Sequence, residues 1–172
     1  MRKFAPYLSF LRDIAIGVLL WFLLTRTVGE ARIVPTPSMV PTIMMGDRLW
    51  TDKLMLHFRP IARGDIVVFT PPPQVKSADP YIKRVIGLPG DIVQVKAGTV
   101  FVNSQPLTEP YVNEKPDYVY GPVTIPAGDY LVLGDNRNNS NDGHLWGFLS
   151  RDAIISRAVY RIWPVSRFGA IK

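Results

Sequence analysis

The sequence contains no cysteine and only two histidines, His57 and His144. Without cysteine, the chain can form neither disulfides nor cysteine-based zinc sites, and it cannot use a thiol in catalysis. Two histidines are also too few for a multi-histidine metal site. We therefore expect a protein that holds no metal ion and no cofactor.

A dense basic run is also absent, although the formal net charge is +6 and the isoelectric point is about 9.7. The 20 Lys and Arg residues are scattered along the chain, whereas nucleic-acid-binding proteins usually gather them in a patch or run. We therefore expect no nucleic-acid partner. Attraction to an anionic membrane surface explains the basic charge at least as well.

A long hydrophobic run is missing too, since the longest one covers only the eleven residues from Ile14 to Leu24. A bilayer core requires about 20 residues. A helix extended from about Tyr7 to Val28 would reach roughly 33 Å at 1.5 Å per residue. The extension includes Arg12, Asp13 and Arg26, charged residues close to its ends that could reach the interface or form pairs.

Three basic residues, Arg2, Lys3 and Arg12, precede this run and favour a cytoplasmic N-terminus. We predict that residues 1–31 form a cytoplasmic N-terminus with one transmembrane helix, and that residues 32–172 form a domain on the exported side. A cleaved secretory signal peptide has the same layout of charge and hydrophobicity. A buried helix of a soluble protein is the other alternative.

Beyond Arg32 the sequence predicts a mainly β class, because short β-branched and aromatic runs alternate with turn residues. The 16 prolines and 13 glycines argue against long helices. Ala97-Gly98 predicts a tight hairpin turn, and the proline-rich loop 71–80 is expected to be exposed and mobile. The predicted strands are 65–70, 81–86, 91–96, 99–103, 130–134 and 153–163.

Ser38 lies in the segment Pro35-Thr-Pro-Ser-Met-Val-Pro-Thr42, whose prolines restrict the backbone around its hydroxyl. In an extended backbone, the Thr36 side chain points to the same face as Ser38. The Thr36 hydroxyl and the Ser38 N–H could then hold the oxyanion of a tetrahedral intermediate, each donor contributing about 3 kcal/mol. The alternative is an ordinary turn serine.

Lys83 lies in the apolar segment Tyr81-Ile-Lys-Arg-Val-Ile86. Strand alternation puts Lys83 and Arg84 on opposite faces, so one of these cations must face the interior. Desolvation of Lys83 would lower its pKa and let it act as the base for a serine nucleophile. A guanidinium cannot take this role because it does not deprotonate. The alternative is a lysine at a strand edge with its amine in solvent.

The segment 134–147 is rich in Asp, Asn and Ser and predicts a structured polar loop. In the functional interpretation, Ser140 orients the lysine amine and Asp142 makes a supporting ion pair. A loop that only satisfies its own hydrogen bonds is one alternative. A Ser38–His144–Asp142 triad is another, although it leaves Lys83 without a role.

The three motifs occur in the order of the type I signal peptidase (leader peptidase) family of Ser-Lys serine proteases, and the chain resembles that family as far as about Trp163. Gly46-Asp47 and Gly64-Asp65 strengthen the resemblance. It implies a small, compact, twisted β-barrel-like catalytic domain. It also implies a membrane-bound endopeptidase that removes signal peptides from exported preproteins after a small residue of an Ala-x-Ala site, through an acyl-enzyme.

The resemblance implies Ser38 as nucleophile, Lys83 as general base, Ser140 as its orienting group, and Thr36 in the oxyanion hole. The substrate would bind as an added β-strand. A set of apolar residues would line the pocket for the small residue, namely Val34, Met39, Ile43, Tyr81 and Ile82.

Two departures from the family pattern stand out. Many bacterial members have Asp-Ser-Arg where this chain has Asp142-Gly-His144. The residue sequence at this point is more similar to that of cyanobacterial or plastid-type members. The membrane that holds the protein would then be either the plasma membrane or the thylakoid membrane. The short interval between Lys83 and Asp135 predicts a minimal accessory β domain.

Two other functions stay open: a related Ser-Lys protease that processes pilus or conjugation proteins, and a non-catalytic peptide-binding domain.

Overall fold

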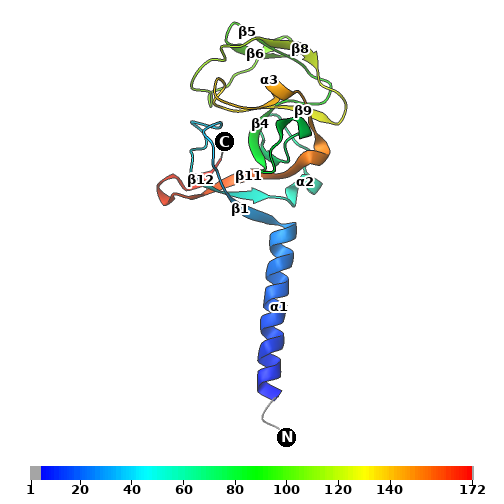
Figure 1. The fold of residues 1–172 in the computed structure, drawn as a ribbon, viewed down its shortest axis with the longest axis vertical. Helices are drawn as coiled ribbons and strands as arrows, with labels where there is room; N and C mark the ends of the chain where they lie inside the picture. The colour runs from blue at the N-terminus through cyan, green and yellow to red at the C-terminus, as the bar shows by residue number, and fades with distance from the viewer. Residues whose placement is uncertain (1–4, 172) are drawn as a thin grey trace.

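The computed structural model describes residues 5–171 and consists of one long helix followed by a β body (Figure 1). Helix α1 spans Ala5–Thr27, and the one-turn helices α2 and α3 span Met55–Phe58 and Gly143–Trp146. The strands are β1 (Gly29–Ile33), β2 (Arg48–Asp52), β3 (Ile66–Phe69), β4 (Tyr81–Gly87), β5 (Ile92–Lys96), β6 (Thr99–Val102), β7 (Gln105–Pro106), β8 (Tyr120–Thr124), β9 (Asp129–Leu133), β10 (Leu149–Ser150), β11 (Ile154–Trp163) and β12 (Gly169–Ala170).

Helix α1 projects away from the β body, and its large apolar side chains are exposed (Figure 1). Arg12 and Asp13 pair with each other at 2.9 Å. Across the described residues, no helix has the combined length and hydrophobicity that a membrane span needs. A helix does form over the segment for which a membrane span was predicted. Its uninterrupted apolar run of eleven residues is about half the length that a bilayer core requires.

The main sheet has eight strands in the order β1-β2-β11-β3-β4-β9-β10, with β12 paired to β11. All neighbouring strands are antiparallel. Register shifts in β11 between Ala158 and Tyr160 and between Arg161 and Trp163 mark bulges, which increase local twist. The sheet is curled but open, because β1 and β10 end the order. The mainly β prediction is confirmed, and the barrel-like part is confirmed as a half-barrel.

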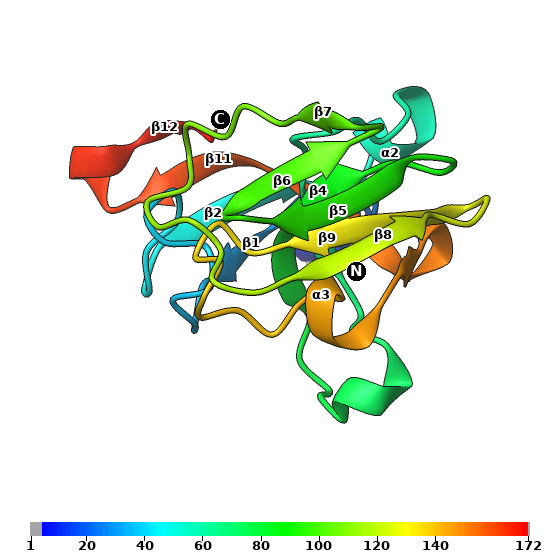
Figure 2. The ribbon, with the colours of Figure 1, turned by 90° about the horizontal axis from the view of Figure 1, so that it is seen from above.

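The chain between β4 and β9 forms a second, four-stranded sheet in the order β7-β6-β5-β8. It lies at the opposite end of the molecule from α1 (Figure 1), and its strands run side by side in Figure 2. Ala97 and Gly98 both have positive φ, 48° and 72°, as the predicted tight turn requires. This small sheet is the minimal accessory domain expected from the short interval after Lys83.

All six predicted strands form, to within a residue or two at their ends. Strands β1, β2 and β8 were not predicted, because they contain few of the apolar β formers that mark a strand. Their sequences are Gly-Glu-Ala-Arg-Ile, Arg-Leu-Trp-Thr-Asp and Tyr-Gly-Pro-Val-Thr. The predicted domain boundary at 31/32 lies within β1. Part of the segment assigned to the N-terminal region is therefore paired with β2.

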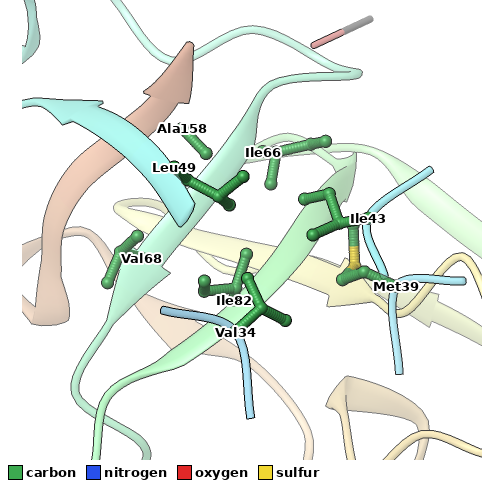
Figure 3. Close-up of a cluster of buried hydrophobic side chains, with 8 residues drawn as sticks. All are labelled: Val34, Met39, Ile43, Leu49, Ile66, Val68, Ile82 and Ala158. Carbon is green, nitrogen blue, oxygen red and sulfur yellow. The ribbon is translucent and has the colours of Figure 1, made fainter. Parts of the chain in front are cut away.

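Three apolar clusters stabilise the two sheets. One of them joins the main sheet to the segment that follows β1, and its members converge in Figure 3. The members of this cluster, called here the lower cluster, are Val34, Met39, Ile43, Leu49, Ile66, Val68, Ile82 and Ala158. Met39 and Ile43 both follow Ser38 closely in the chain, so their burial helps to fix the position of the serine.

Candidate active site

Ser38 lies in a turn that is held by hydrogen bonds from the main chain and the side chain of Asn136. Its carbonyl accepts a hydrogen bond of 3.1 Å from Asn136 N, and the Asn136 side chain donates to Pro37 O at 3.2 Å. Only 7% of Ser38 is exposed. The loop after β9 therefore fixes the backbone of the serine segment, although about 100 positions separate the two.

Lys83 lies on β4 and points at the serine. Its Nζ is 2.7 Å from Ser38 Oγ and 3.0 Å from Ile82 O. The Nζ also lies 5.2 Å from the centroid of the Tyr81 ring. Lys83 is only 3% exposed, so the pair is largely removed from solvent. The structure thus brings together the two residues that the motifs predict as nucleophile and base.

Burial sets the protonation of this lysine. Desolvation lowers the pKa of Lys83 from 10.5 to about 8, against the opposing pull of the Asp142 and Asp135 carboxylates. A charged amine is disfavoured where water cannot solvate it. With a pKa near 8, an appreciable fraction of Lys83 is neutral at physiological pH and can accept a proton.

The adjacent cation, Arg84, is buried as well, at 2% exposure. Strand alternation required at least one of the two cations to face the interior, and the structure buries both. Arg84 donates to both carboxylate oxygens of Asp135, at 2.8 and 2.7 Å, and Thr42 Oγ1 donates to the same carboxylate at 2.5 Å. β4 is covered on both faces, and a bidentate partner compensates the buried guanidinium.

Thr36 lies beside the hydroxyl of Ser38 at the mouth of the site. Its Oγ1 is 3.3 Å from Ser38 Oγ, and its residue is exposed at the mouth of the site. The hydroxyl is thus on the solvent side of the nucleophile, where a substrate carbonyl would enter.

Ser140 does not make the predicted contact with Lys83. Its Oγ is buried and has no hydrogen-bond partner among the described residues. It packs against Gly134, where even a Cβ would collide with Ser140 Oγ and with Ser38 O. Ser140 therefore lies next to the serine segment without bonding the lysine amine.

Asp142 is fully buried and accepts hydrogen bonds from other residues of the loop after β9. One oxygen accepts from Gly134 N at 2.8 Å, and the other lies 2.7 Å from His144 Nδ1. The His144 ring stacks on Tyr118 at a centroid distance of 4.0 Å. The side-chain partner of Asp142 in this structure is therefore the imidazole of His144.

The geometry does not support a catalytic triad. Ser38 Oγ is bonded to Lys83 Nζ and Thr36 Oγ1, and within residues 5–171 no hydrogen bond joins it to His144. The histidine instead lies between Asp142 and Tyr118.

A cleft of about 490 Å³ opens over the Ser–Lys pair. Its lining includes four of the five predicted pocket residues, Val34, Met39, Tyr81 and Ile82. Ile43 is not among them. It has no exposed surface and packs into the lower cluster next to Met39 (Figure 3), so the structure does not bring it to the cleft as predicted.

Four polar residues of the cleft were not predicted: Ser77, Asp79, Asn139 and Asn141. They come from the proline-rich loop before β4 and from the loop after β9. Their residue types suit any exposed turn, so nothing local distinguishes them. Only the antiparallel pairing of β4 with β9 brings the two loops to one cleft.

Comparison with known proteins identifies the family to which the chain belongs. The profile of the family described as "Signal peptidase, peptidase S26" matches residues 7–163. The chain belongs to this signal peptidase family. It is therefore a serine peptidase, a hydrolase of the class that cleaves signal peptides from preproteins.

Several signal peptidases are similar over most of the chain. Signal peptidase I of Leptolyngbya laminosa is 48% identical over 97% of this chain and 85% of its own length. A probable thylakoidal processing peptidase 2 of Arabidopsis thaliana is 40% identical over 87% of this chain and 42% of its own. The sequence Asn-Asp-Gly-His predicted a similarity to cyanobacterial and plastid members, and these comparisons confirm it.

A solved signal peptidase I from Enterococcus faecalis shares the fold. It matches with a TM-score of 0.50 and 29% identity, over 58% of this chain and 97% of its own length.

Proposed function

We propose that this signal peptidase cuts preproteins through a Ser38–Lys83 dyad and an acyl-enzyme. The observation that carries the proposal is the 2.7 Å contact between Lys83 Nζ and Ser38 Oγ, made by a buried lysine whose pKa is lowered to about 8. A neutral amine at that distance can accept the hydroxyl proton, which serine needs in order to attack.

In the first step, Ser38 Oγ attacks the carbonyl carbon of the residue before the cut, and Lys83 Nζ takes the hydroxyl proton. The Thr36 hydroxyl and the Ser38 N–H donate to the oxyanion. The C–N bond then breaks, and the amine of the mature protein leaves with the proton from Lys83. This step leaves the signal peptide esterified to Ser38. Water, deprotonated by the same amine, hydrolyses the ester and regenerates the serine.

Substrate selection is proposed to follow from the apolar part of the cleft. Val34, Met39 and Ile82 line it beside the nucleophile, which favours a small residue such as alanine before the cut. The main-chain edge of β4 pairs with β9 only from Arg84 onward. Residues 81–83 therefore leave one edge where an extended preprotein can add as a strand, which gives an Ala-x-Ala preference. Ser140 and Asp142 support this site by holding the loop behind Ser38.

We further propose that the enzyme works at a plasma or thylakoid membrane, with its catalytic residues on the exported side. Membrane lipid is the proposed partner of α1, because the large apolar side chains of this helix are exposed and exposed apolar surface of this extent marks an interaction site.

The test is cleavage of a preprotein with an Ala-x-Ala site by the detergent-solubilised enzyme, with product masses as the readout. The wild type should cut after the second alanine. Ser38→Ala should abolish cutting while melting at nearly the same temperature, because a single net hydrogen bond contributes about 1 kcal/mol. Unchanged turnover in a folded Ser38→Ala variant would end the proposal.

A second readout separates the two steps. Mass spectrometry of the wild type mixed with substrate and quenched in acid should detect the signal peptide as an ester on Ser38. A peptidase that cuts without any such adduct, even under rapid quenching, would require direct attack by water instead.

A further inference from the structure

The cleft over the Ser–Lys pair has two chemically different walls. One is apolar and contains Val34, Met39 and Ile82. The other is polar and comes from two loops, with Ser77 and Asp79 before β4 and Asn139 and Asn141 after β9. A small apolar residue before the cut uses the first wall. The second wall is left for another part of the substrate.

Asp79 is the only carboxylate among the described residues that line the cleft. Its residue is exposed, and its carboxylate makes no hydrogen bond or ion pair with any residue of the described chain. The turn around it is closed by a hydrogen bond from the main chain to a side chain, since Asp79 N donates to Ser77 Oγ at 3.2 Å. The backbone is thus held while the charge stays available to a ligand.

The two other carboxylates behind the cleft are buried. Asp135 and Asp142 are essentially fully buried, and they pair with Arg84 and His144. Lys83 is the only cation in the lining, and it must be neutral when it acts as a base. In the form of the enzyme that starts the reaction, the cleft therefore presents one net negative charge, that of Asp79.

We propose that Asp79 is a specificity-determining residue that favours preproteins with a lysine or arginine next to the cut. The proposal rests on the function proposed above. In an extended substrate, the side chains at positions −3 and −1 before the cut point to one face, and those at −2 and +1 point to the other. With the small residues against the apolar wall, positions −2 and +1 face the polar wall and its carboxylate.

The expected effect is modest, because Asp79 is exposed. Exposed ion pairs contribute about 0.2–1 kcal/mol, which is a factor of roughly 1.5 to 5 in kcat/KM. Such a pair is screened by salt. The preference should therefore shrink between low and high ionic strength, whereas a preference based on side-chain shape would persist.

The test compares substrates that differ only at position −2, with lysine, glutamine or glutamate, and a second set that differs only at +1. The wild type should cut the lysine substrate of at least one set faster than the glutamate substrate by about 1.5- to 5-fold. Asp79→Asn should remove this ratio, and Asp79→Lys should invert it. Asp152→Asn is the control, because Asp152 is also exposed but does not line the cleft, and it should keep the wild-type ratio.

A lysine-to-glutamate ratio that is the same in the wild type, Asp79→Asn and Asp79→Lys would overturn the proposal. The glutamine substrate separates this failure from failure of the proposed function, since its cleavage needs only the Ser–Lys pair. Binding of the uncut peptides to Ser38→Ala, with and without Asp79→Asn, gives a second reading. Tighter binding of the lysine peptide that is lost with Asp79→Asn supports the role of Asp79 even where turnover is absent, and equal binding contradicts it.

Discussion

Lys83 Nζ lies 2.7 Å from Ser38 Oγ although the two residues are 45 positions apart in the sequence. β4 carries the lysine, and the turn after β1 carries the serine. The lower cluster packs both segments together, with Val34 and Met39 on one side and Ile82 on the other. The distance between nucleophile and base is thus set by apolar packing, and the same burial lowers the pKa of the amine.

The lowered pKa of Lys83 predicts how activity depends on pH. Because only the neutral amine can accept the serine proton, kcat/KM should rise with pH and level off above about pH 8. The measurement is a pH profile of kcat/KM on one Ala-x-Ala substrate. A profile that is flat between pH 6 and 9, or that has its midpoint near the ordinary lysine pKa, would contradict the burial argument.

The same shift predicts an effect on stability. Between its folded pKa of about 8 and its unfolded value of 10.5, Lys83 binds fewer protons folded than unfolded. Its unfavourable contribution is therefore complete below pH 8 and is recovered as the pH rises towards 10.5. Lys83→Met should raise the free energy of unfolding by up to about 3 kcal/mol at pH 7, and by less at pH 10. Denaturant titrations at both pH values measure it, and an equal difference at both would contradict it.

The pair of Arg84 with Asp135 should be essential to folding, because both side chains are buried, at 3% and 0% exposure. Asp135→Asn removes the buried carboxylate to which Arg84 donates two hydrogen bonds and should destabilise the protein by about 3–5 kcal/mol. Arg59→Gln is the control, since Arg59 pairs with Asp65 while half exposed, and it should cost less than about 1 kcal/mol. Similar unfolding midpoints for the two variants would be inconsistent with this assignment.

His144 should matter for the loop and not for proton transfer. His144→Ala removes the imidazole partner of buried Asp142 and should lower the free energy of unfolding by about 1–3 kcal/mol, while cleavage persists. Lys83→Met should instead lose the roughly 100- to 10 000-fold that a general base contributes. Cleavage assays on both variants, below their melting temperatures, decide between them. Greater loss with His144→Ala than with Lys83→Met would restore the triad.

Gly134 should be indispensable, because a Cβ there would collide with Ser38 O and Ser140 Oγ. Gly134→Ala should push the serine segment away from Lys83 and lower kcat by about 100-fold, as a displacement of about 1 Å can. Gly17→Ala, where the added methyl meets nothing within 4 Å, is the matched control and should keep full activity. Near-wild-type turnover of a folded Gly134→Ala enzyme would show that this approach does not position the nucleophile.

The sequence by itself determined much of the β class and supplied the residues on which the proposed chemistry rests. Local patterns suffice for strands β3 to β6, β9 and β11 and for the Ala97-Gly98 turn, because alternation and turn residues act over a few positions. They also identify Ser38 and Lys83, since few residue types can serve as nucleophile and base without cysteine or a metal. The apolar run of α1 could likewise be read directly from the sequence.

Only the tertiary structure decided what each side chain faces. It buried both Lys83 and Arg84, sent Ile43 into the core, left Ser140 Oγ without a partner and placed Asp79 in the cleft. Each of these outcomes depends on segments that are distant in sequence and meet through strand pairing and apolar packing. The pKa of Lys83 has the same origin, because desolvation depends on everything that surrounds the amine and not on its neighbours along the chain.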